Sequence, residues 1–285
     1  MKKKTSLLLS VLVIISSIFF YQELLSSIAN IRSPHRAPPC EYPLEIEKFL
    51  QTPLSFIGMG SQCVAFSAKN TPYVLKLCKA NRYQIPSFLE QPPLSFFLKD
   101  YVERKKRRKK EKQEADYASY IHAYSKTPKQ SGIVFLHLEK TNTPGVVIQL
   151  KDPLGISHYL ERNDLIFYIQ KKARPLKEHL IKLLQEQKTA QIKTFFYELL
   201  AMVIENTKSG VLLKDINPKK NIGVSEEGLP VWIDPGRIIP STLNLETALD
   251  MLSKEFTPFL DSIDKTLASH FLEAVTTLKK QKDTP

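Results

Sequence analysis

Residues 214–236 read KDINPKKNIGVSEEGLPVWIDPG, and this stretch decides how the rest of the chain is interpreted. It holds two short apolar runs with strand character, Ile222–Val224 and Val231–Ile233, joined by a polar turn. Asp215 and Asn221 precede this predicted hairpin, and Asp234 follows it directly. The hairpin and its three polar neighbours are therefore the first candidate for a functional site.

Each feature of this stretch also has a plain structural interpretation. An aspartate such as Asp215 can simply cap a turn, and Asp234-Pro235-Gly236 has the composition of an ordinary turn. Their meaning depends on what accompanies them elsewhere in the chain.

A second group of residues lies in the first half of the chain, where Gly58 and Gly60 end a predicted strand over 54–59. Glycines at a strand end let backbone N–H groups approach a phosphate closely. A second predicted strand over 63–68 follows instead of a helix, which argues against a dinucleotide-binding βαβ unit and against a P-loop. A plain hairpin turn is the alternative interpretation.

The next predicted strand, 73–78, places Lys76 among apolar residues. Lysine is rarely buried without a partner, and alternation puts Lys76 on the strand face that also carries Val74 and Cys78. A cation facing the glycine loop would hold the α- and β-phosphates of ATP. Its acidic partner would come from the helix predicted over 103–124, where Glu111 and Glu114 are candidates and Glu114 is preferred. Snorkelling from an edge strand is the alternative role for Lys76.

In this order and with these gaps, the residues resemble the protein-kinase pattern. The elements that match are Gly58 and Gly60, Lys76, a helical glutamate, Asp215, Asn221 and Asp234-Pro235-Gly236. The resemblance implies ATP and Mg²⁺ as cofactors, with Asp234 and Asn221 as metal ligands and Asp215 as the group that orients or deprotonates an acceptor hydroxyl. Lys219 or Lys220 would neutralise charge on the transferred phosphoryl group.

The chain departs from the kinase pattern at several places. Asn221 follows Asp215 by six positions, one more than the pattern, and Leu213-Lys214 stands where His-Arg is expected. Pro235 replaces the phenylalanine of the metal-binding motif, and no segment resembling APE follows. These departures favour a small-molecule, lipid or sugar kinase, or a pseudokinase, over a protein kinase with a peptide platform.

A second resemblance covers roughly residues 55–240. The motifs that carry it include Gln62–Phe66, Tyr73–Lys76, Phe135–Leu138, Asp152–Gly155, Ile169–Ala173, Asp215 to Gly223, and Ile233–Arg237. They are similar to an uncharacterised family of kinase-like proteins in chlamydia-related intracellular bacteria. That resemblance implies the fold more than an activity. It makes Ile169–Ala173 the interlobe hinge, with Gln170 and Lys171 as nucleotide-binding residues whose backbone groups would bind adenine.

The N-terminus has the features of an export or anchor signal. Three lysines at positions 2–4 precede an uncharged run from Leu7 to Tyr21, at the short limit for spanning a bilayer. An uncleaved anchor and a cleaved signal peptide both remain open over 1–29, followed by a proline-rich linker over 30–45. We expect membrane anchoring or export, with a bacterial inner membrane as the suspected location. Lysines retained in the cytoplasm would place the domain outside it, where ATP is scarce.

Composition fits a globular protein that favours anionic partners. The chain has 285 residues, 42% of them hydrophobic, and a formal net charge of +12. Three cysteines without a CxxC motif exclude a disulfide scaffold and a zinc cluster, and Cys63 and Cys78 are interpreted as buried apolar residues. The basic run Arg104–Lys110 is either a solvated helix face or a binding site, for which lipid headgroups are favoured over nucleic acid.

The sequence therefore predicts an α+β, protein-kinase-like two-lobed fold after an N-terminal hydrophobic helix. A sheet-rich N-lobe would span 46–170, and a reduced helical C-lobe 171–285. Further strands are expected at 133–138, 146–150, 165–170 and 211–213, and helices at 175–185, 189–206, 243–260 and 262–279. Three functions stay open: an active kinase with an unknown hydroxyl acceptor or protein partner, a membrane-tethered pseudokinase scaffold or nucleotide sensor, and a non-kinase binding protein.

Overall fold

The computed structural model describes residues 36–37, 41–141 and 145–282. The hydrophobic segment predicted over 1–29 lies outside these residues. No helix in the described ranges is both long enough and apolar enough to cross a bilayer. The chain forms two compact units, with unit 1 built from 1–113 and 137–168 and unit 2 from 114–136 and 169–285. Unit 1 is rich in sheet and unit 2 in helix, so the mixed α+β class is confirmed.

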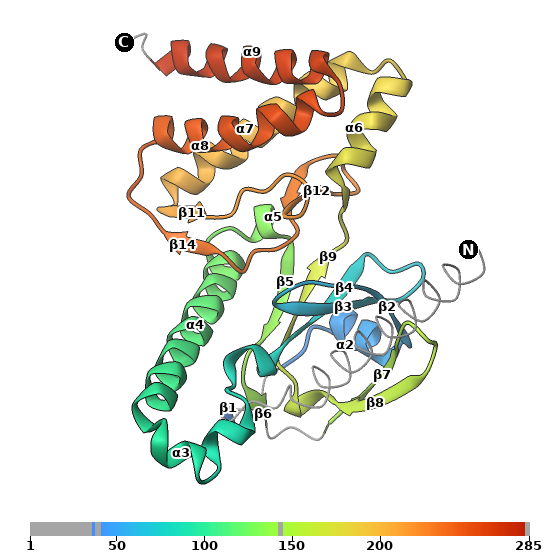
Figure 1. The fold of residues 1–285 in the computed structure, drawn as a ribbon. Coiled ribbons are helices and arrows are strands. Elements are labelled where there is room, and N and C mark those ends of the chain that lie inside the picture. The colour runs from blue at the N-terminus through green and yellow to red at the C-terminus, as the bar shows by residue number, and fades with distance from the viewer. Residues whose placement is uncertain (1–35, 38–40, 142–144, 283–285) are drawn as a thin grey trace, which may run out of the picture. The chain divides into compact units, whose positions relative to one another are not determined.

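Five strands of unit 1 lie side by side in the order β4-β3-β2-β7-β8 (Figure 1). All neighbours are antiparallel except β2 and β7, which are parallel. Their bounds are β2 Leu54–Met59, β3 Cys63–Ser67, β4 Tyr73–Cys78, β7 Val147–Lys151 and β8 Ser157–Glu161. The first four were predicted to within one residue at each end, whereas β8 was missed.

Apolar side chains on both faces hold this sheet in the core of unit 1. Val64, Leu75 and Leu77 are fully buried on one face of the sheet, and Val74 and Cys78 are buried on the other. This burial agrees with the strand prediction for these β-branched and aliphatic runs. The turn between β3 and β4 uses Asn70 at φ 61°, a left-handed conformation that asparagine tolerates better than most residues. Helix α2 (Leu44–Gln51), which was not predicted, begins two residues before the predicted start of the N-lobe at residue 46.

The other elements of unit 1 are short, apart from the first part of α4. They are β1 (Arg36–Ala37), the 3₁₀ turns Ala80–Tyr83, Ser87–Glu90 (η2) and Arg162–Asp164, α3 (Leu94–Phe97) and β6 (Lys140–Thr141). Strand β1 pairs with β6 in parallel, so the linker predicted over 30–45 contains one regular pairing. The proline-containing segment 86–97 contains η2 and α3.

The helix predicted over 103–124 is α4 (Lys99–Ser125), which starts four residues earlier. Its first half belongs to unit 1 and its second half to unit 2. Two strands also pass from one unit into the other along the chain, namely β5 (Ile133–His137) and β9 (Phe167–Lys171).

Three helices form the core of unit 2: α7 (Thr189–Lys208), α8 (Leu245–Asp261) and α9 (Lys265–Lys282) (Figure 1). The fully buried rings of Phe196 and Phe256 both contact that of Phe271, at centroid distances of 5.5 and 5.6 Å. Aromatic pairs at this spacing add to the free energy gained from burial.

The remaining elements of unit 2 are short. Two helices complete it, α5 (Pro128–Ser131) and α6 (Leu176–Gln185). A small antiparallel sheet has the order β10-β12-β13, and β11 pairs with β14. Their bounds are β10 Arg174–Pro175, β11 Val211–Leu213, β12 Ile222–Val224, β13 Pro230–Trp232 and β14 Ile238–Pro240. The predicted hairpin of residues 222–233 is thereby confirmed.

The turn between β7 and β8 is organised by Asp152. Its carboxylate accepts hydrogen bonds from the N–H groups of Leu154 and Ile156, both at 2.9 Å, and lies 3.0 Å from Nε2 of His158. Burial by itself would raise the pKa of Asp152, but these contacts together hold that pKa below its ordinary value.

Asp152→Asn is expected to destabilise unit 1 by about 1–3 kcal/mol at neutral pH, because a hydrogen-bonded anion is removed. Since the folded-state pKa is depressed, the contribution of Asp152 is present above its unfolded-state pKa and is lost as the pH falls through the folded-state pKa. Urea unfolding at pH 7 and pH 3 should show the difference shrinking in acid. Exposed Glu139→Gln is the control, and an equal cost at both pH values would contradict this role.

Candidate functional site

The predicted glycine loop joins β2 to β3 in unit 1. The β2–β3 register shifts between Phe56 and Gly58, and the N–H of Gly60 donates to the carbonyl of Cys63 at 2.9 Å. A Cβ placed on Gly58 would meet no heavy atom within 4 Å. The backbone at Gly58 is therefore open on that side, as a loop that receives a phosphate requires.

Lys76 lies in β4 opposite Ala65 and is only 9% exposed. Its Nζ stands 5.6 Å from the ring centroid of Tyr168, within the range of a cation–π contact. Two residues further along β4, the N–H of Cys78 donates to the carbonyl of Ile166. Strand β4 is therefore hydrogen-bonded on this side as well as to β3 on the other. Snorkelling from an edge strand, the alternative role for Lys76, does not fit this position.

Two cysteines of unit 1, Cys63 and Cys78, face each other beside Lys76. Cys63 pairs with Cys78 across β3 and β4, and both are buried thiols whose sulfur atoms lie 3.8 Å apart. Their interpretation as small buried side chains is confirmed.

In unit 2, the loop from Asp215 to Asn221 is closed by its own hydrogen bonds. The Nδ2 of the buried Asn221 donates to the Asp215 carbonyl at 2.7 Å, and the Asn221 N–H donates to the Asn217 carbonyl at 2.9 Å. Asn217 Oδ1 accepts from the N–H of Lys219 at 2.9 Å. The six-residue spacing of Asp215 and Asn221 is thus accommodated by a compact turn. Lys219 and Lys220 are exposed at its tip.

Asp234 is connected to the same loop through the backbone. The N–H of Ile233 donates to the carbonyl of Asn221 at 2.8 Å, which places Asp234 directly after a residue bonded to the loop. One carboxylate oxygen of Asp234 accepts from the N–H of Gly236 at 3.2 Å, as in an Asp-Pro-Gly turn. Asp215, Asn221 and Asp234 therefore belong to one local structure.

The donor set of this loop suits a hard cation such as Mg²⁺. The amide nitrogen of Asn221 is engaged by Asp215, which leaves its oxygen as the acceptor, and Asp234 supplies a half-buried carboxylate. Over the described ranges, no group of three or more His, Cys, Asp or Glu residues could hold a metal by itself. A bound Mg²⁺ would complete its ligands with water or phosphate oxygens.

Asp215 is half-buried and lies near a cation. Its Oδ2 is 3.9 Å from Nη1 of Arg237, and each side chain is about half exposed. Such a contact contributes little to stability. It does compete with any other partner of the Asp215 carboxylate.

The two glutamates considered as partners of Lys76 both lie on α4, Glu111 in the part that belongs to unit 1 and Glu114 in the part that belongs to unit 2. Glu114 is exposed on α4, and its pairing with Lys76, which belongs to unit 1, stays a prediction. Glu111, the other candidate, lies 3.9 Å from Arg107 on the same helix.

The predicted hinge residues make structural contacts. Gln170 is buried, and its Nε2 donates to the carbonyls of Ser131 and Trp232, both at 2.5 Å. The N–H of Lys171 donates to the Gly132 carbonyl at 2.8 Å, so that group is engaged within the protein. Binding of adenine by the backbone of this segment stays a prediction.

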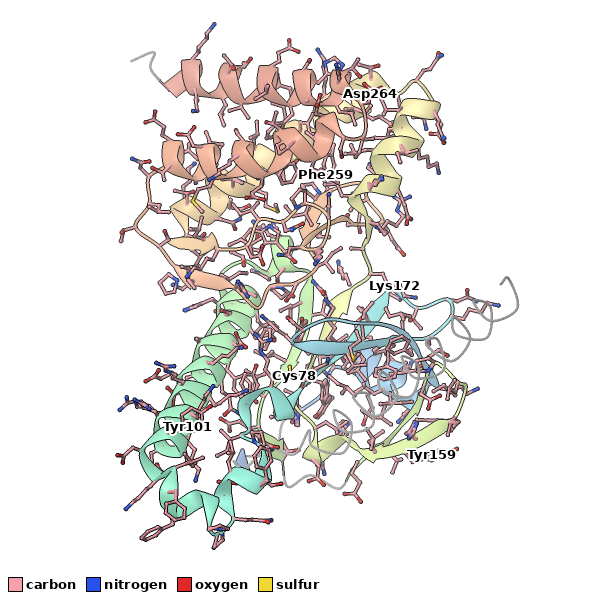
Figure 2. The ribbon with its side chains drawn as sticks, viewed as in Figure 1. Cys78, Tyr101, Tyr159, Lys172, Phe259 and Asp264 are labelled. Carbon is pink, nitrogen blue, oxygen red and sulfur yellow. The ribbon has the colours of Figure 1, made fainter. Side chains whose placement is uncertain are left out.

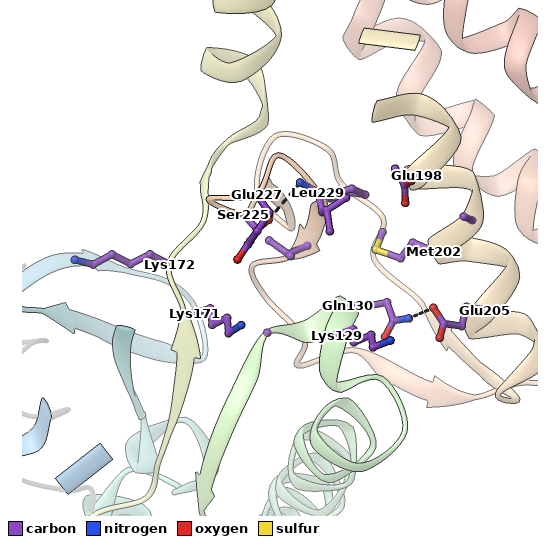
Figure 3. Close-up of a pocket in the computed structure, with 14 residues that line it drawn as sticks. Lys129, Gln130, Lys171, Lys172, Glu198, Met202, Glu205, Ser225, Glu227 and Leu229 are labelled. Atoms are coloured by element: carbon purple, nitrogen blue, oxygen red, sulfur yellow. Dashed lines mark hydrogen bonds between the residues drawn. The ribbon is translucent and has the colours of Figure 1, made fainter. Parts of the chain in front are cut away.

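A pocket of about 360 Å³ lies in unit 2 beside this segment (Figure 3). Its charged lining consists of Lys129, Lys171, Lys172, Glu198, Glu205 and Glu227, and Gln130 donates a hydrogen bond to Glu205. Equal numbers of cations and carboxylates do not favour a polyanion such as ATP.

One residue that the sequence did not single out, Gly223 in β12, allows β10 to pack closely against β12. A Cβ there would lie 2.8 Å from the Arg174 carbonyl and 2.7 Å from the side chain of Ile233. A glycine between two strand residues signals such a close approach, although the sequence does not say what approaches.

No protein-family model matches the sequence, and no curated protein matches it either. Solved structures of WbdD are similar. One with the kinase inhibitor LY294002 has 14% identity and a TM-score of 0.38 over 78% of this chain and 45% of that chain. One titled as the bifunctional kinase-methyltransferase WbdD has 13% identity and a TM-score of 0.34 over 75% and 43%. A third has 14% identity and a TM-score of 0.35 over 76% and 44%. The chain spans less than half of each.

Proposed function

We propose that this chain is a kinase-like ATP-binding protein that transfers the γ-phosphate to a hydroxyl acceptor. One observation carries the proposal. The Asn221 side chain holds the carbonyl of Asp215, and the Asn221 carbonyl receives the N–H of Ile233, the residue before Asp234. A base candidate and two oxygen ligands are thereby built into one loop system.

Each site residue has a chemical role in this proposal. Lys76 holds the α- and β-phosphates, with Glu114 as its predicted partner, and Gly58 and Gly60 let the backbone approach them. Asn221 and Asp234 would hold Mg²⁺, which when bound neutralises phosphate charge. The hydroxyl oxygen of the acceptor bonds to the γ-phosphorus, and Asp215 accepts the proton that this hydroxyl loses. The bond between that phosphorus and the β–γ bridging oxygen breaks, and ADP leaves.

A second candidate function is a pseudokinase that acts as a scaffold or nucleotide sensor. The contact between Asp215 and Arg237 favours it, because the guanidinium competes with an acceptor hydroxyl for the Asp215 carboxylate. Replacement of the metal-motif phenylalanine by Pro235 points the same way.

The membrane tether over 1–29 and the relationship to kinase-like proteins of chlamydia-related bacteria are parts of this proposal as well. The basic, apolar start of the chain supports the tether. The motifs of residues 62–76 and 215–237 support the relationship.

Calorimetry of Mg²⁺-ATP binding to the full-length chain in a mild detergent tests the site. We expect saturable binding that is lost in Lys76→Ala and Asp234→Asn but kept in the exposed controls Lys69→Ala and Asp261→Asn. Absence of binding to a folded wild-type chain would refute the proposal.

The Asp215→Asn variant separates the two candidate functions. An active kinase should keep ATP binding in this variant and lose turnover about 10²- to 10⁴-fold. ATP binding without turnover in the wild type would identify the pseudokinase.

A further inference from the structure

Apolar aromatic side chains project from the segment that connects η2, α3 and the start of α4 in unit 1. Phe96 and Phe97 are 82% and 78% exposed, and Phe88, Leu98 and Tyr101 are exposed as well. Helix α3 contacts η2, and Lys106 of α4 reaches Glu90 of η2 at 2.9 Å, so these short pieces form one structure. A cluster of this size marks an interaction site more often than an isolated exposed residue does.

A dense basic surface continues from this aromatic cluster along α4. Residues 99–112 contain nine lysines and arginines against three acids. Tyr101, Arg104, Lys105 and Arg108 are spaced to lie on one side of the helix, and Figure 2 shows Tyr101 on its first turns. Within the described part of the chain, Arg104 and Arg108 form no ion pair.

An open groove of about 910 Å³ joins the two features. Phe88, Leu89 and Tyr101 line it together with Lys105 and Lys109. Burial and the nearby charges of Lys112, Arg82 and Lys105 lower the pKa of Lys109. An anion in the groove would relieve this repulsion.

We propose that this basic–aromatic surface, residues 84–112, docks on an anionic lipid bilayer. Phe96 and Phe97 enter the headgroup region, the α4 cations face the anionic lipids, and Lys105 and Lys109 contact a lipid phosphate in the groove. Apolar rings beside a row of cations are the combination that binds such membranes.

The aromatic geometry favours a bilayer over single-stranded RNA. Phe96 and Phe97 pack edge to face, with centroids 5.8 Å apart and planes at 89°, and Lys105 covers the ring of Tyr101 at 5.5 Å. Bases need open parallel ring faces on which to stack. Insertion into a headgroup layer needs only exposed apolar surface.

The first test places a tryptophan probe on the surface of the full-length chain. Phe97→Trp is mixed with vesicles of brominated phosphatidylcholine, with or without phosphatidylserine, and Leu154→Trp is the control at another exposed site of unit 1. We expect quenching and a blue shift of the introduced tryptophan only with phosphatidylserine, weaker at high salt, and no change for the control. Because this readout is local, vesicle binding by residues 1–29 does not imitate it.

Three results would overturn the proposal. One is the absence of quenching. Another is an emission already blue-shifted without vesicles and unchanged by them, which would mean that the surface is covered by another segment or a second copy. The third is quenching equal to that of Leu154→Trp.

The second test removes charge. Arg104→Gln with Arg108→Gln should weaken the phosphatidylserine-dependent signal of Phe97→Trp roughly 10- to 30-fold, and the matched pair Lys177→Gln with Lys254→Gln should not. If the arginine pair instead loses binding to a single-stranded RNA while the vesicle signal is unchanged, the surface binds nucleic acid and the proposal fails.

Discussion

Gln170→Glu is expected to lower the free energy of unfolding of unit 2 by about 2–5 kcal/mol at neutral pH, because two buried carbonyls lose their donor. The substitution keeps the shape of the side chain and removes both amide hydrogens. It also places a carboxylate against the Ser131 and Trp232 carbonyls, each 2.5 Å from the wild-type nitrogen. Urea unfolding followed by the fluorescence of Trp232, the single tryptophan, measures the loss.

The β12–β13 register explains why no other group replaces Gln170. The Ile233 N–H donates to the Asn221 carbonyl, so these two residues form a hydrogen-bonded pair. The next pair, Ile222 with Trp232, is therefore not hydrogen-bonded across the hairpin. The carbonyl of Trp232 consequently points away from β12. Ser131 is the last residue of α5, so no N–H group of a following helical turn donates to its carbonyl. Gln170 satisfies both carbonyls at once.

Two observations would check this explanation. The deficit of Gln170→Glu should shrink as the pH falls through the raised pKa of the introduced buried carboxyl, because its protonated form donates one hydrogen bond. The control is Gln149→Glu. Gln149 is a half-buried residue of β7 whose Nε2 donates to Ser157 of β8, and its substitution should cost less than about 1 kcal/mol. Equal losses for the two variants would contradict the role of Gln170.

Gly223→Ala is the second substitution with a large expected effect, a loss of about 1–3 kcal/mol measured by the same unfolding experiment. The added methyl would overlap the Arg174 carbonyl, which belongs to the backbone of β10, and the Ile233 side chain. Relief requires β10 to move away from β12, at the base of the loop that positions Asn221.

Gly58→Ala is the matched control, because it also lies in a strand and its added Cβ meets nothing within 4 Å. It should leave stability unchanged or raise it slightly, since alanine has fewer unfolded conformations than glycine. A stable Gly223→Ala variant would show that β10 and β12 are not packed as tightly as their distances indicate.

The strands of unit 1 could be predicted because their sequences combine β-branched and aliphatic runs with clear turns. Residues 54–78 carry that pattern, and β2, β3 and β4 follow it. Strand β8 does not, because its five residues are all half-buried or exposed and show no apolar alternation. Helix α2 was missed for a different reason: it directly follows the proline-rich stretch, which hides its start.

The candidate site could be predicted as a set of residues but not as a set of contacts. Motif order singled out Asp215, Asn221 and Asp234, and the structure joins them. It also gives Gln170, predicted as a nucleotide-binding residue, two carbonyl partners from distant segments. Such partners depend on tertiary packing, which a local pattern does not encode.

The assembly of unit 2 from two separated pieces of chain has a consequence for biosynthesis. The first piece, 114–136, leaves the ribosome about a hundred residues ahead of Trp232. Gln170 donates hydrogen bonds to the carbonyls of both Trp232 and Ser131, which lies in that first piece. At roughly 5–20 residues per second, the nascent chain waits about 5–20 s before that connection can close. Until then, α5 and the second half of α4 lack their native neighbours, and this is the interval in which a chaperone would be most useful to the growing polypeptide.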